Sequence, residues 1–139
     1  MAVRIVRAAE HAGGNVHDPS FAGLRLLLVE DEYLLALYMS ELLGDMGIEI
    51  VGPVSCVADA LALIEQEPAI DAAILDVNLA GEAVFPVADR LEERRVPFAF
   101  ASGYDPALMP ARFRDIAVCQ KPIDAEAVRG AVARLRQRT

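Results

Sequence analysis

Residues 25–32 read RLLLVEDE, an apolar run that ends in Glu30 and Asp31. Two later apolar runs also carry a charged residue near their ends, AAILDVNL with Asp76 and VCQKP with Lys121. If all three runs are parallel strands of one sheet, these charges meet at its carboxyl edge, where open α/β sheets hold their functional sites. The sequence therefore predicts one site assembled from distant parts of the chain.

The chain alternates between short apolar runs and longer segments of helical period from Gly23 onward. Several runs are continuously apolar, which is typical of strands that helices cover on both faces. The order βαβαβαβαβα predicts an α/β fold with a doubly wound, five-stranded parallel sheet. Strands are expected within the segments RLLLV, IEIVGPV, AAILDVNL, PFAFAS and IAVCQ.

The expected helices have recognisable ends. Gly47 follows the first helix where a left-handed residue is needed, and Ser55 is the expected N-cap of the second. Pro86 is tolerable only in the first turn of the third helix, and Pro110 predicts a short or broken fourth helix within residues 105–115. The first helix is read from apolar residues at steps of three and four: Leu35, Tyr38, Met39, Leu42 and Met46.

Length and composition indicate one compact domain. The chain has 139 residues, 55% of them hydrophobic, but no apolar stretch approaches the roughly 18 residues of a membrane span. The start lacks the apolar segment of a secretory signal, so we expect a cytoplasmic protein. A net charge of −8 repels nucleic acid phosphates, and direct nucleic acid binding is not expected. Cys56 and Cys119 are expected to be buried reduced thiols.

The N-terminal residues differ from the rest of the chain. Residues 1–22 contain breaker residues and no sustained pattern, so we expect an arm or tail there and a folded domain over residues 23–139. His11 and His17 have a spacing that fits no common metal site and are interpreted as tail residues. The apolar residues of the arm could dock on a partner or on the domain itself.

The acidic residues at the expected sheet edge favour a divalent cation. Two unit charges about 4 Å apart repel by roughly 4 kcal/mol at an effective dielectric constant of about 20. Glu30, Asp31 and Asp76 would therefore hold Mg²⁺, which prefers one or two carboxylates, waters and a phosphate oxygen. The backbone carbonyl of Asn78, two residues after Asp76, could complete the coordination shell.

The same edge has the groups that phosphoryl transfer needs. An aspartate can attack phosphorus to form an acyl phosphate, and Asp76 is the best candidate because it stands at a strand end. Ser102 offers a hydroxyl to one phosphoryl oxygen, and Lys121 offers an ammonium to another. Together with the cation, Lys121 would neutralise charge on the transferred group.

The fragments VEDE, LDVNL, ASGY and QKP, in this order and at these intervals, resemble the receiver domain of bacterial two-component response regulators. The resemblance covers residues 24 to about 137 and implies a flavodoxin-like fold with strand order 2-1-3-4-5. It also implies a role for each matching residue: Glu30 and Asp31 as the acidic pair for Mg²⁺, Asp76 as phosphoacceptor, Ser102 as switch hydroxyl, and Lys121 as phosphate-binding lysine.

The sequence departs from the usual receiver pattern at a few positions. Most receivers have a proline four residues after the acceptor and a glycine a few residues later. Here Ala80 and Gly81 occupy that stretch, so we expect a more mobile loop. Val118 stands where receivers commonly have an aromatic switch residue. PFAFASGYD resembles the divergent FAT GUY group of receivers, which implies that Tyr104 replaces that switch and that Asn78 and Tyr104 tune the lifetime of the phosphate.

The resemblance implies a stand-alone signalling protein rather than an enzyme, with self-phosphorylation and autodephosphorylation as its chemistry. Its partners would be a sensor histidine kinase or histidine phosphotransfer protein, and a downstream protein that binds differently after phosphorylation. One alternative is a phosphatase of the haloacid dehalogenase type, but that family has a second aspartate where this chain has Asn78. A pseudo-receiver that binds partners without phosphorylation is the other alternative.

Overall fold

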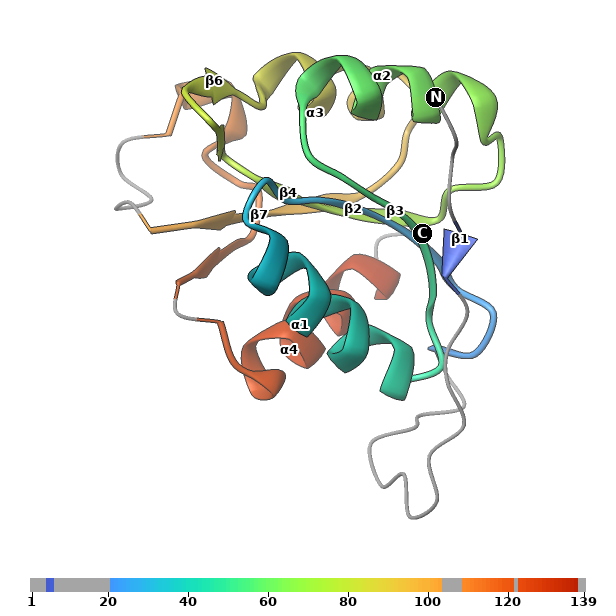
Figure 1. Cartoon of the computed structure of the whole chain (residues 1–139). Coiled ribbons are helices and arrows are strands. Elements are labelled where there is room, and N and C mark those ends of the chain that lie inside the picture. The colour runs from blue at the N-terminus through green and yellow to red at the C-terminus, as the bar shows by residue number, and fades with distance from the viewer. Residues whose placement is uncertain (1–4, 7–20, 104–108, 122, 138–139) are drawn as a thin grey trace.

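The computed structural model describes residues 5–6, 21–103, 109–121 and 123–137. Within these residues, a six-stranded sheet has the order β1-β3-β2-β4-β7-β8 (Figure 1). Its strands are Ile5–Val6 (β1), Arg25–Val29 (β2), Glu49–Val54 (β3), Ala72–Asp76 (β4), Phe98–Ser102 (β7) and Val118–Gln120 (β8).

The five strands β3, β2, β4, β7 and β8 pair in parallel. In chain order they are the second, first, third, fourth and fifth strands of the folded domain, so the predicted order 2-1-3-4-5 is confirmed. A parallel arrangement brings the carboxyl ends of neighbouring strands to the same edge, which is the condition that the predicted site requires.

Helices cover both faces of the sheet. Figure 1 shows α2 and α3 on one face and α1 and α4 on the other, which confirms the doubly wound α/β fold. The helices are Tyr33–Asp45 (α1), Val57–Gln66 (α2), Phe85–Glu93 (α3) and Ala125–Gln137 (α4).

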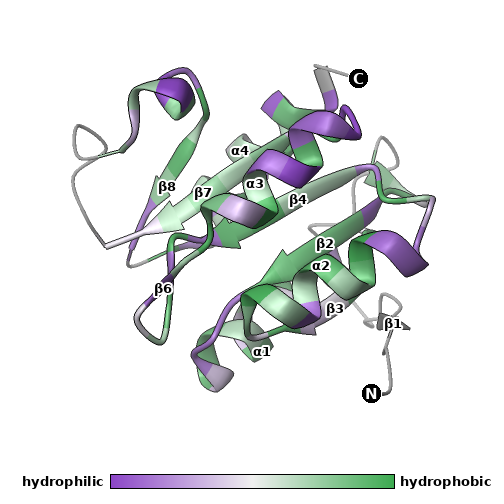
Figure 2. Cartoon of the chain, turned by 90° about the horizontal axis from the view of Figure 1, so that it is seen from above, coloured by the Kyte–Doolittle hydropathy of each residue, from purple (hydrophilic) through white to green (hydrophobic). Residues whose placement is uncertain are grey.

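Strand β2 shows why its sequence is continuously apolar. Leu26 and Leu28 belong to the core beneath α1 and α4, whereas Leu27 and Val29 belong to the core beneath α2 and α3. All four side chains are fully buried because successive residues of a strand point to opposite faces. In Figure 2 the central strands are coloured as hydrophobic along most of their length, while α3 above them carries hydrophilic residues.

Three of the four helix-end predictions hold. Gly47 has a φ of 91° directly after α1, and Pro86 lies in the first turn of α3. The predicted short fourth helix is a 3₁₀ turn at Ala111–Phe113. The Ser55 cap is wrong, because α2 begins at Val57 with Cys56 as its N-cap and no side chain caps it. Ser55 lies one residue too early for its hydroxyl to reach the first free N–H groups of the helix.

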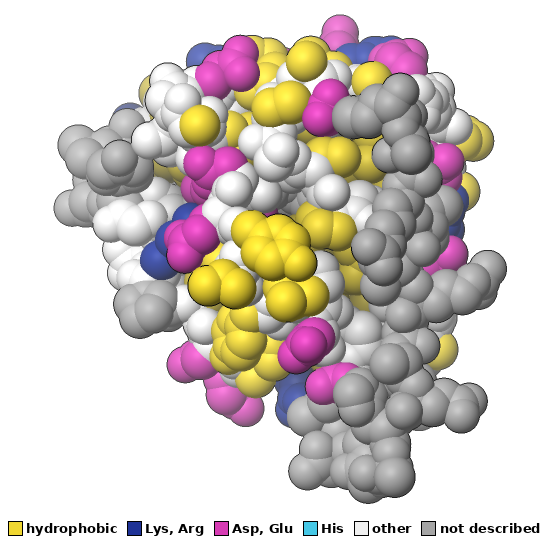
Figure 3. Space-filling view, viewed as in Figure 1, with side chains coloured by type: hydrophobic (Ala, Val, Ile, Leu, Met, Phe, Trp, Pro, Cys, Tyr) yellow, Lys and Arg dark blue, Asp and Glu magenta, His cyan; other side chains and the backbone are white. Residues whose placement is uncertain are grey.

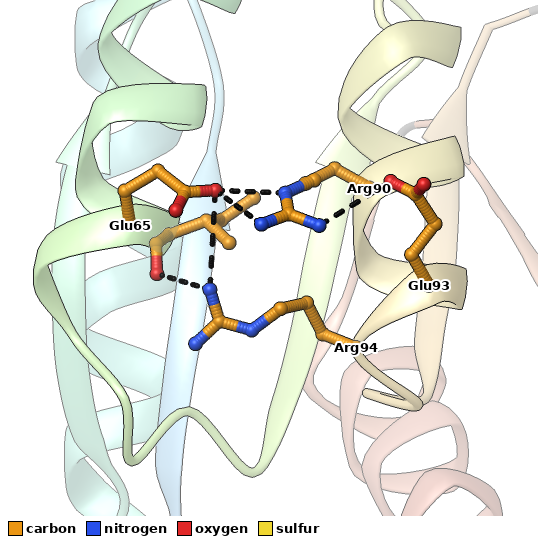
Figure 4. A network of polar contacts seen from close by, with 5 residues as sticks. Glu65, Arg90, Glu93 and Arg94 are labelled. Atoms are coloured by element: carbon orange, nitrogen blue, oxygen red, sulfur yellow. Dashed lines mark hydrogen bonds and ion pairs between the residues drawn. The ribbon is translucent and has the colours of Figure 1, made fainter.

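A polar network joins α2 and α3 along their outer surfaces (Figure 4). Arg90 Nη2 lies 2.6 Å from Glu65 Oε1, and Arg90 Nη1 lies 3.4 Å from Glu93 Oε1. Arg94 Nη1 donates to the backbone carbonyl of Ile64 at 3.1 Å, near the end of α2. These contacts fix the two helices side by side over the same face of the sheet.

The N-terminal segment contributes a strand to the sheet. β1 pairs antiparallel with β3, with Ile5 opposite Val51 and Val6 opposite Ile50. Phe21, also within the predicted arm, is buried in the core beneath α1 and α4. The domain boundary at residue 23 stays a prediction, but part of the segment before it contacts the domain. His11 and His17 lie outside the described residues.

An aromatic cluster anchors the 3₁₀ turn to the sheet. The Phe113 ring centroid lies 5.4 Å from that of Phe85 and 5.4 Å from that of Phe100. Phe98 packs against both Phe100 and Phe113, and the buried side chain of Phe113 is 1% exposed. Phe113 therefore anchors the described 3₁₀ turn to the core beneath α2 and α3.

We predict that Phe113→Ala lowers the free energy of unfolding by about 3–5 kcal/mol, because it removes a buried ring and leaves a cavity among aromatic neighbours. Chemical denaturation measures this loss directly. Arg112→Ala, which removes an exposed ion pair with Asp89, should cost less than about 1 kcal/mol. Equal effects of the two substitutions would contradict the anchoring role of Phe113.

Candidate functional site

Four charged side chains converge at the carboxyl edge of the sheet. Glu30 and Asp31 follow β2, Asp76 is the last residue of β4, and Lys121 follows β8. Carboxylate oxygens of Glu30, Asp31 and Asp76 lie within 4.8 Å of one another. Lys121 Nζ lies 3.3 Å from Glu30 Oε1 and 3.4 Å from Asp76 Oδ2. The structure thus brings together the four charges on which the predicted site depends.

Burial makes this cluster of charges costly. Glu30 is 2% exposed and Asp76 is 5% exposed. Burial, with further contributions from Asp31 and Glu30, raises the pKa of Asp76 to about 8, although the charge of Lys121 opposes the shift. Without a bound cation, Asp76 therefore holds a proton near neutral pH and shares it with its acidic neighbours.

Lys121 and Asp31 have pKa values shifted in favour of their charged forms. Burial acts to lower the pKa of Lys121, but the negative charges of Asp76 and Glu30 outweigh it and raise the pKa above its ordinary value. Burial acts to raise the pKa of Asp31, but hydrogen bonds from Asp76 and from the N–H of Ala80 outweigh it and lower the pKa. The site therefore combines a permanent ammonium with at least one permanent carboxylate.

The acidic cluster fits a hard divalent cation. Glu30 Oε2 accepts a hydrogen bond from the N–H of Glu32 at 3.1 Å. Its other oxygen, Oε1, is buried and has no hydrogen-bond partner among the described residues, although the ammonium of Lys121 lies within ion-pair distance. Three carboxylates in one buried cluster, balanced within the described residues by the single ammonium of Lys121, form the oxygen-rich environment that Mg²⁺ and Ca²⁺ select.

Ser102 lies at the end of β7, next to the strand that carries Asp76. Its side chain is buried, and its carbonyl accepts a hydrogen bond from the N–H of Lys121 at 2.8 Å. The ends of β7 and β8 are thereby joined at the site. Tyr104 lies outside the described residues, and Val118 is a half-buried residue of β8 that packs against the core beneath α2 and α3.

The residues after Asp76 form a hairpin that the sequence analysis missed. Its strands are Asn78–Leu79 (β5) and Glu82–Ala83 (β6), and Ala80 and Gly81 form the turn with φ values of 52° and 91°. The N–H of Asn78 donates to Asp76 Oδ1 at 3.3 Å, and the N–H of Ala80 donates to Asp31 Oδ2 at 2.8 Å. The expected loose loop is instead hydrogen-bonded to the acidic cluster. The signal that could have found it is the replacement of the usual proline by Ala80.

An open apolar groove begins beside the site. It has a volume of about 520 Å³ and lies between α1 and the chain that follows β8, lined by Glu32, Leu34, Leu35, Tyr38, Lys121 and Ile123. The large apolar side chains that are exposed in the described part of the chain all belong to α1: Tyr33, Leu34, Leu37 and Tyr38.

These side chains contribute to an apolar surface over α1, seen near the middle of Figure 3. Tyr38 belongs to the apolar series that predicted this helix, but its side chain is 43% exposed.

Solved structures with the same fold and closely similar sequence reveal the family. SdrG from Sphingomonas melonis Fr1 is 45% identical, with a TM-score of 0.72, and the match covers 81% of this chain and 95% of SdrG. A response regulator receiver protein from Sinorhizobium medicae WSM419 is 25% identical, with a TM-score of 0.72 and coverage of 84% and 97%. The chain belongs to the response regulator receiver domains.

A second structure, of the BeF3-activated conformation of SdrG from Pseudomonas melonis Fr1, is 44% identical to this receiver with a TM-score of 0.72 and covers 83% of it and 98% of that chain. No protein-family model and no curated protein matched the sequence. Among the helices that the structure describes, none combines the length and apolar composition that a membrane crossing requires.

We predict that metal-free receiver loses stability as pH rises from about 4 to 8. Because the pKa of Asp76 is raised to about 8 in the folded state, the folded chain binds a proton more tightly than the unfolded chain across this interval. Asp76→Asn keeps the shape of the side chain without its charge, so it should be more stable than wild type by on the order of 2 kcal/mol at pH 8 and not at pH 4.

Thermal unfolding in the presence of a chelator measures this difference. Asp89→Asn, which changes an exposed carboxylate on α3, is the matched control and should follow the wild-type pH profile. If the thermal stabilities of wild type and Asp76→Asn changed with pH in the same way, ionisation of Asp76 would not be the cause of the predicted loss of stability.

Proposed function

We propose that this receiver accepts a phosphoryl group on Asp76 from a phosphohistidine of a sensor histidine kinase or histidine phosphotransfer protein. Mg²⁺ is the proposed cofactor, and altered binding to a downstream protein is the proposed output. The observation that supports this most directly is the environment of Asp76. Its carboxylate stands at the end of a central strand, buried between two further carboxylates and the ammonium of Lys121.

Transfer forms a bond between an Asp76 oxygen and phosphorus while the bond from phosphorus to the donor's imidazole nitrogen breaks. The electron pair of the broken bond stays on that nitrogen, which takes a proton from water. Asp76 must be ionised to attack, so its raised pKa has to be reduced in the reacting complex. When held by Glu30, Asp31, Asp76 and the carbonyl of Asn78, Mg²⁺ supplies the positive charge that favours the ionised form and offsets the phosphoryl oxygens.

Lys121 and Ser102 have complementary parts in this proposal. The Lys121 ammonium, which pairs with Glu30 and Asp76 before transfer, turns to an oxygen of the new phosphoryl group. The Ser102 hydroxyl binds another oxygen. Because the Lys121 N–H donates to the Ser102 carbonyl, displacement of either residue affects the ends of both β7 and β8. The added charge of about −1.5 to −2 is the physical trigger for that displacement.

The switch residues beyond the site remain part of the proposal. Val118 has no aromatic ring to swing inward, and the PFAFASGYD stretch supports membership of the FAT GUY group, with Tyr104 as the replacement. Asn78 would act with Tyr104 in setting the phosphate lifetime. The proposed surface for the downstream protein includes the segment after β7. Its described part contains the 3₁₀ turn at Ala111–Phe113, which Phe113 anchors to the core.

The apolar surface of α1 supports docking of the phosphodonor there. Its groove extends from Leu34 and Tyr38 to Lys121, so a protein that covers it brings its own side chains to the mouth of the site. A phosphohistidine must approach Asp76 from solvent, and apolar contacts around the opening would exclude water during transfer. We therefore assign the α1 surface to the phosphodonor and not to the downstream partner.

Intact-mass measurement after incubation with acetyl phosphate tests phosphorylation. Wild type with Mg²⁺ should gain the mass of one phosphoryl group per chain, and both omission of Mg²⁺ and Asp76→Asn should abolish the gain. Asp89→Asn should be labelled like wild type. Unlabelled wild type would favour the pseudo-receiver alternative, and continuous hydrolysis of a free phosphomonoester would favour the phosphatase alternative.

The docking assignment has its own test, with a phosphorylated histidine phosphotransfer protein as donor. Leu34→Glu places a charge in the groove and should slow transfer from the protein donor by about tenfold or more. Labelling by acetyl phosphate should stay unchanged because that donor needs no protein surface. Ala62→Glu, on the exposed face of α2, is the matched control. If Leu34→Glu slowed phosphorylation by both donors equally, the substitution would act on the phosphorylation site and not on docking of the protein donor.

A further inference from the structure

The turn of the β5–β6 hairpin is bound directly to the acidic cluster. The N–H of Ala80 donates to Asp31 Oδ2 at 2.8 Å, and this contact joins residues that are far apart in the sequence. We propose that Ala80 is a positioning residue for the metal site: its N–H orients the Asp31 carboxylate toward the divalent cation. This inference rests on the proposed Mg²⁺ site and adds a residue that contributes no ligand atom.

The hairpin holds the Ala80 N–H in place from several sides. Asn78 pairs with Ala83 and Leu79 with Glu82, and the turn residues Ala80 and Gly81 both have left-handed φ values. Such a two-residue turn matches the twist of the strands that it joins. The N–H of Gly81 donates to the side-chain oxygen of Asn78 at 2.8 Å. Ala80 therefore donates from a turn whose other N–H, that of Gly81, is already paired.

The residue type at position 80 decides whether this contact exists. A proline, which most receivers have at this position, has no N–H and fixes φ near −65°. It could neither donate to Asp31 nor adopt the φ of 52° that Ala80 has. The absence of proline at position 80 thus permits both the turn conformation and the hydrogen bond. The left-handed conformation is strained for alanine, and the hydrogen bond is one of the contacts that stabilise it.

The contact has a clear consequence for the cluster. Asp31 is more accessible than Glu30 and Asp76, so its carboxylate would otherwise be the least constrained of the three. The Ala80 N–H occupies only one position on the Asp31 carboxylate, so the carboxylate could still bind a cation. Groups that orient a metal ligand typically contribute 10- to 100-fold in metal affinity. The effect is reciprocal, because a cation that fixes Asp31 also stabilises the hairpin.

Isothermal titration of Mg²⁺ into the unphosphorylated 139-residue chain tests the inference. Ala80→Pro removes the N–H and should weaken Mg²⁺ binding by about tenfold or more. Ala80→Gly keeps the N–H and accommodates a positive φ, so it should bind Mg²⁺ within about twofold of wild type. Mg²⁺ should also slow hydrogen exchange at the backbone amide of position 80, both in wild type and in Ala80→Gly.

A matched variant separates the hydrogen bond from general strain in the turn. Gly81→Ala strains the same turn, since Gly81 has a φ of 91°, but its Cβ would meet nothing within 4 Å and the Ala80 N–H remains. It should lower thermal stability in a chelator while keeping Mg²⁺ affinity within about threefold of wild type. Equal losses of affinity in Gly81→Ala and Ala80→Pro would overturn the inference, as would wild-type affinity in Ala80→Pro.

Failure of this inference differs from failure of the proposed function. If wild type binds no Mg²⁺, both the positioning role and the proposed metal site are wrong. If wild type binds Mg²⁺ and Ala80→Pro binds it equally well, only the positioning role is wrong. Loss of affinity in Ala80→Pro alone, with retention in Ala80→Gly, supports the role of the N–H.

Discussion

The mutual repulsion of Glu30, Asp31 and Asp76 is the constraint around which this receiver is organised. The three carboxylates lie at the ends of neighbouring parallel strands, and burial denies Glu30 and Asp76 the water that would screen their charges. One ammonium, that of Lys121, offsets part of this repulsion within the chain. The remaining negative charge is what a divalent cation would neutralise. Burial, together with the neighbouring Asp31 and Glu30, raises the pKa of Asp76 to about 8.

That balance depends on the fold at more than one level. Parallel pairing of β2 with β4, and of β7 with β8, brings residues from four distant segments to one edge. Cores on both faces hold those strands in register, so the positions of the charges follow from apolar packing. The Ser102 carbonyl then accepts the N–H of Lys121, which fixes the backbone that carries the ammonium.

The fold and the charged residues of the site were predictable because they depend on strong local patterns. Continuously apolar runs indicate strands covered on both faces, and an acidic or basic residue at the end of such a run lies at the sheet edge. The hairpin after Asp76 was not predictable in this way. Ala80 has no preference for a positive φ, and the hydrogen bond that compensates is donated by its N–H to the carboxylate of Asp31, 49 residues earlier.

Two other features also depended on tertiary contacts. The helical spacing of α1 could not distinguish the buried Met39 from its neighbour Tyr38, because both fit an apolar face of generous width. The pairing of the N-terminal segment with β3 was left open, because the apolar residues of the arm could have docked on the domain or on a partner. In both cases the outcome depends on tertiary contacts and not on the local sequence pattern.

The position of β1 has a consequence for how copies of the chain meet one another. β3 would otherwise be the outermost strand, and its unpaired N–H and C=O groups, next to apolar residues such as Ile50 and Val51, form a template for intermolecular association. An antiparallel strand from the same chain occupies part of that template. At the opposite edge of the sheet, β8 has only three residues, which leaves little backbone for pairing with a strand of another chain. The short N-terminal strand thus shields part of the β3 edge from pairing with another chain, at the border of the sheet opposite β8.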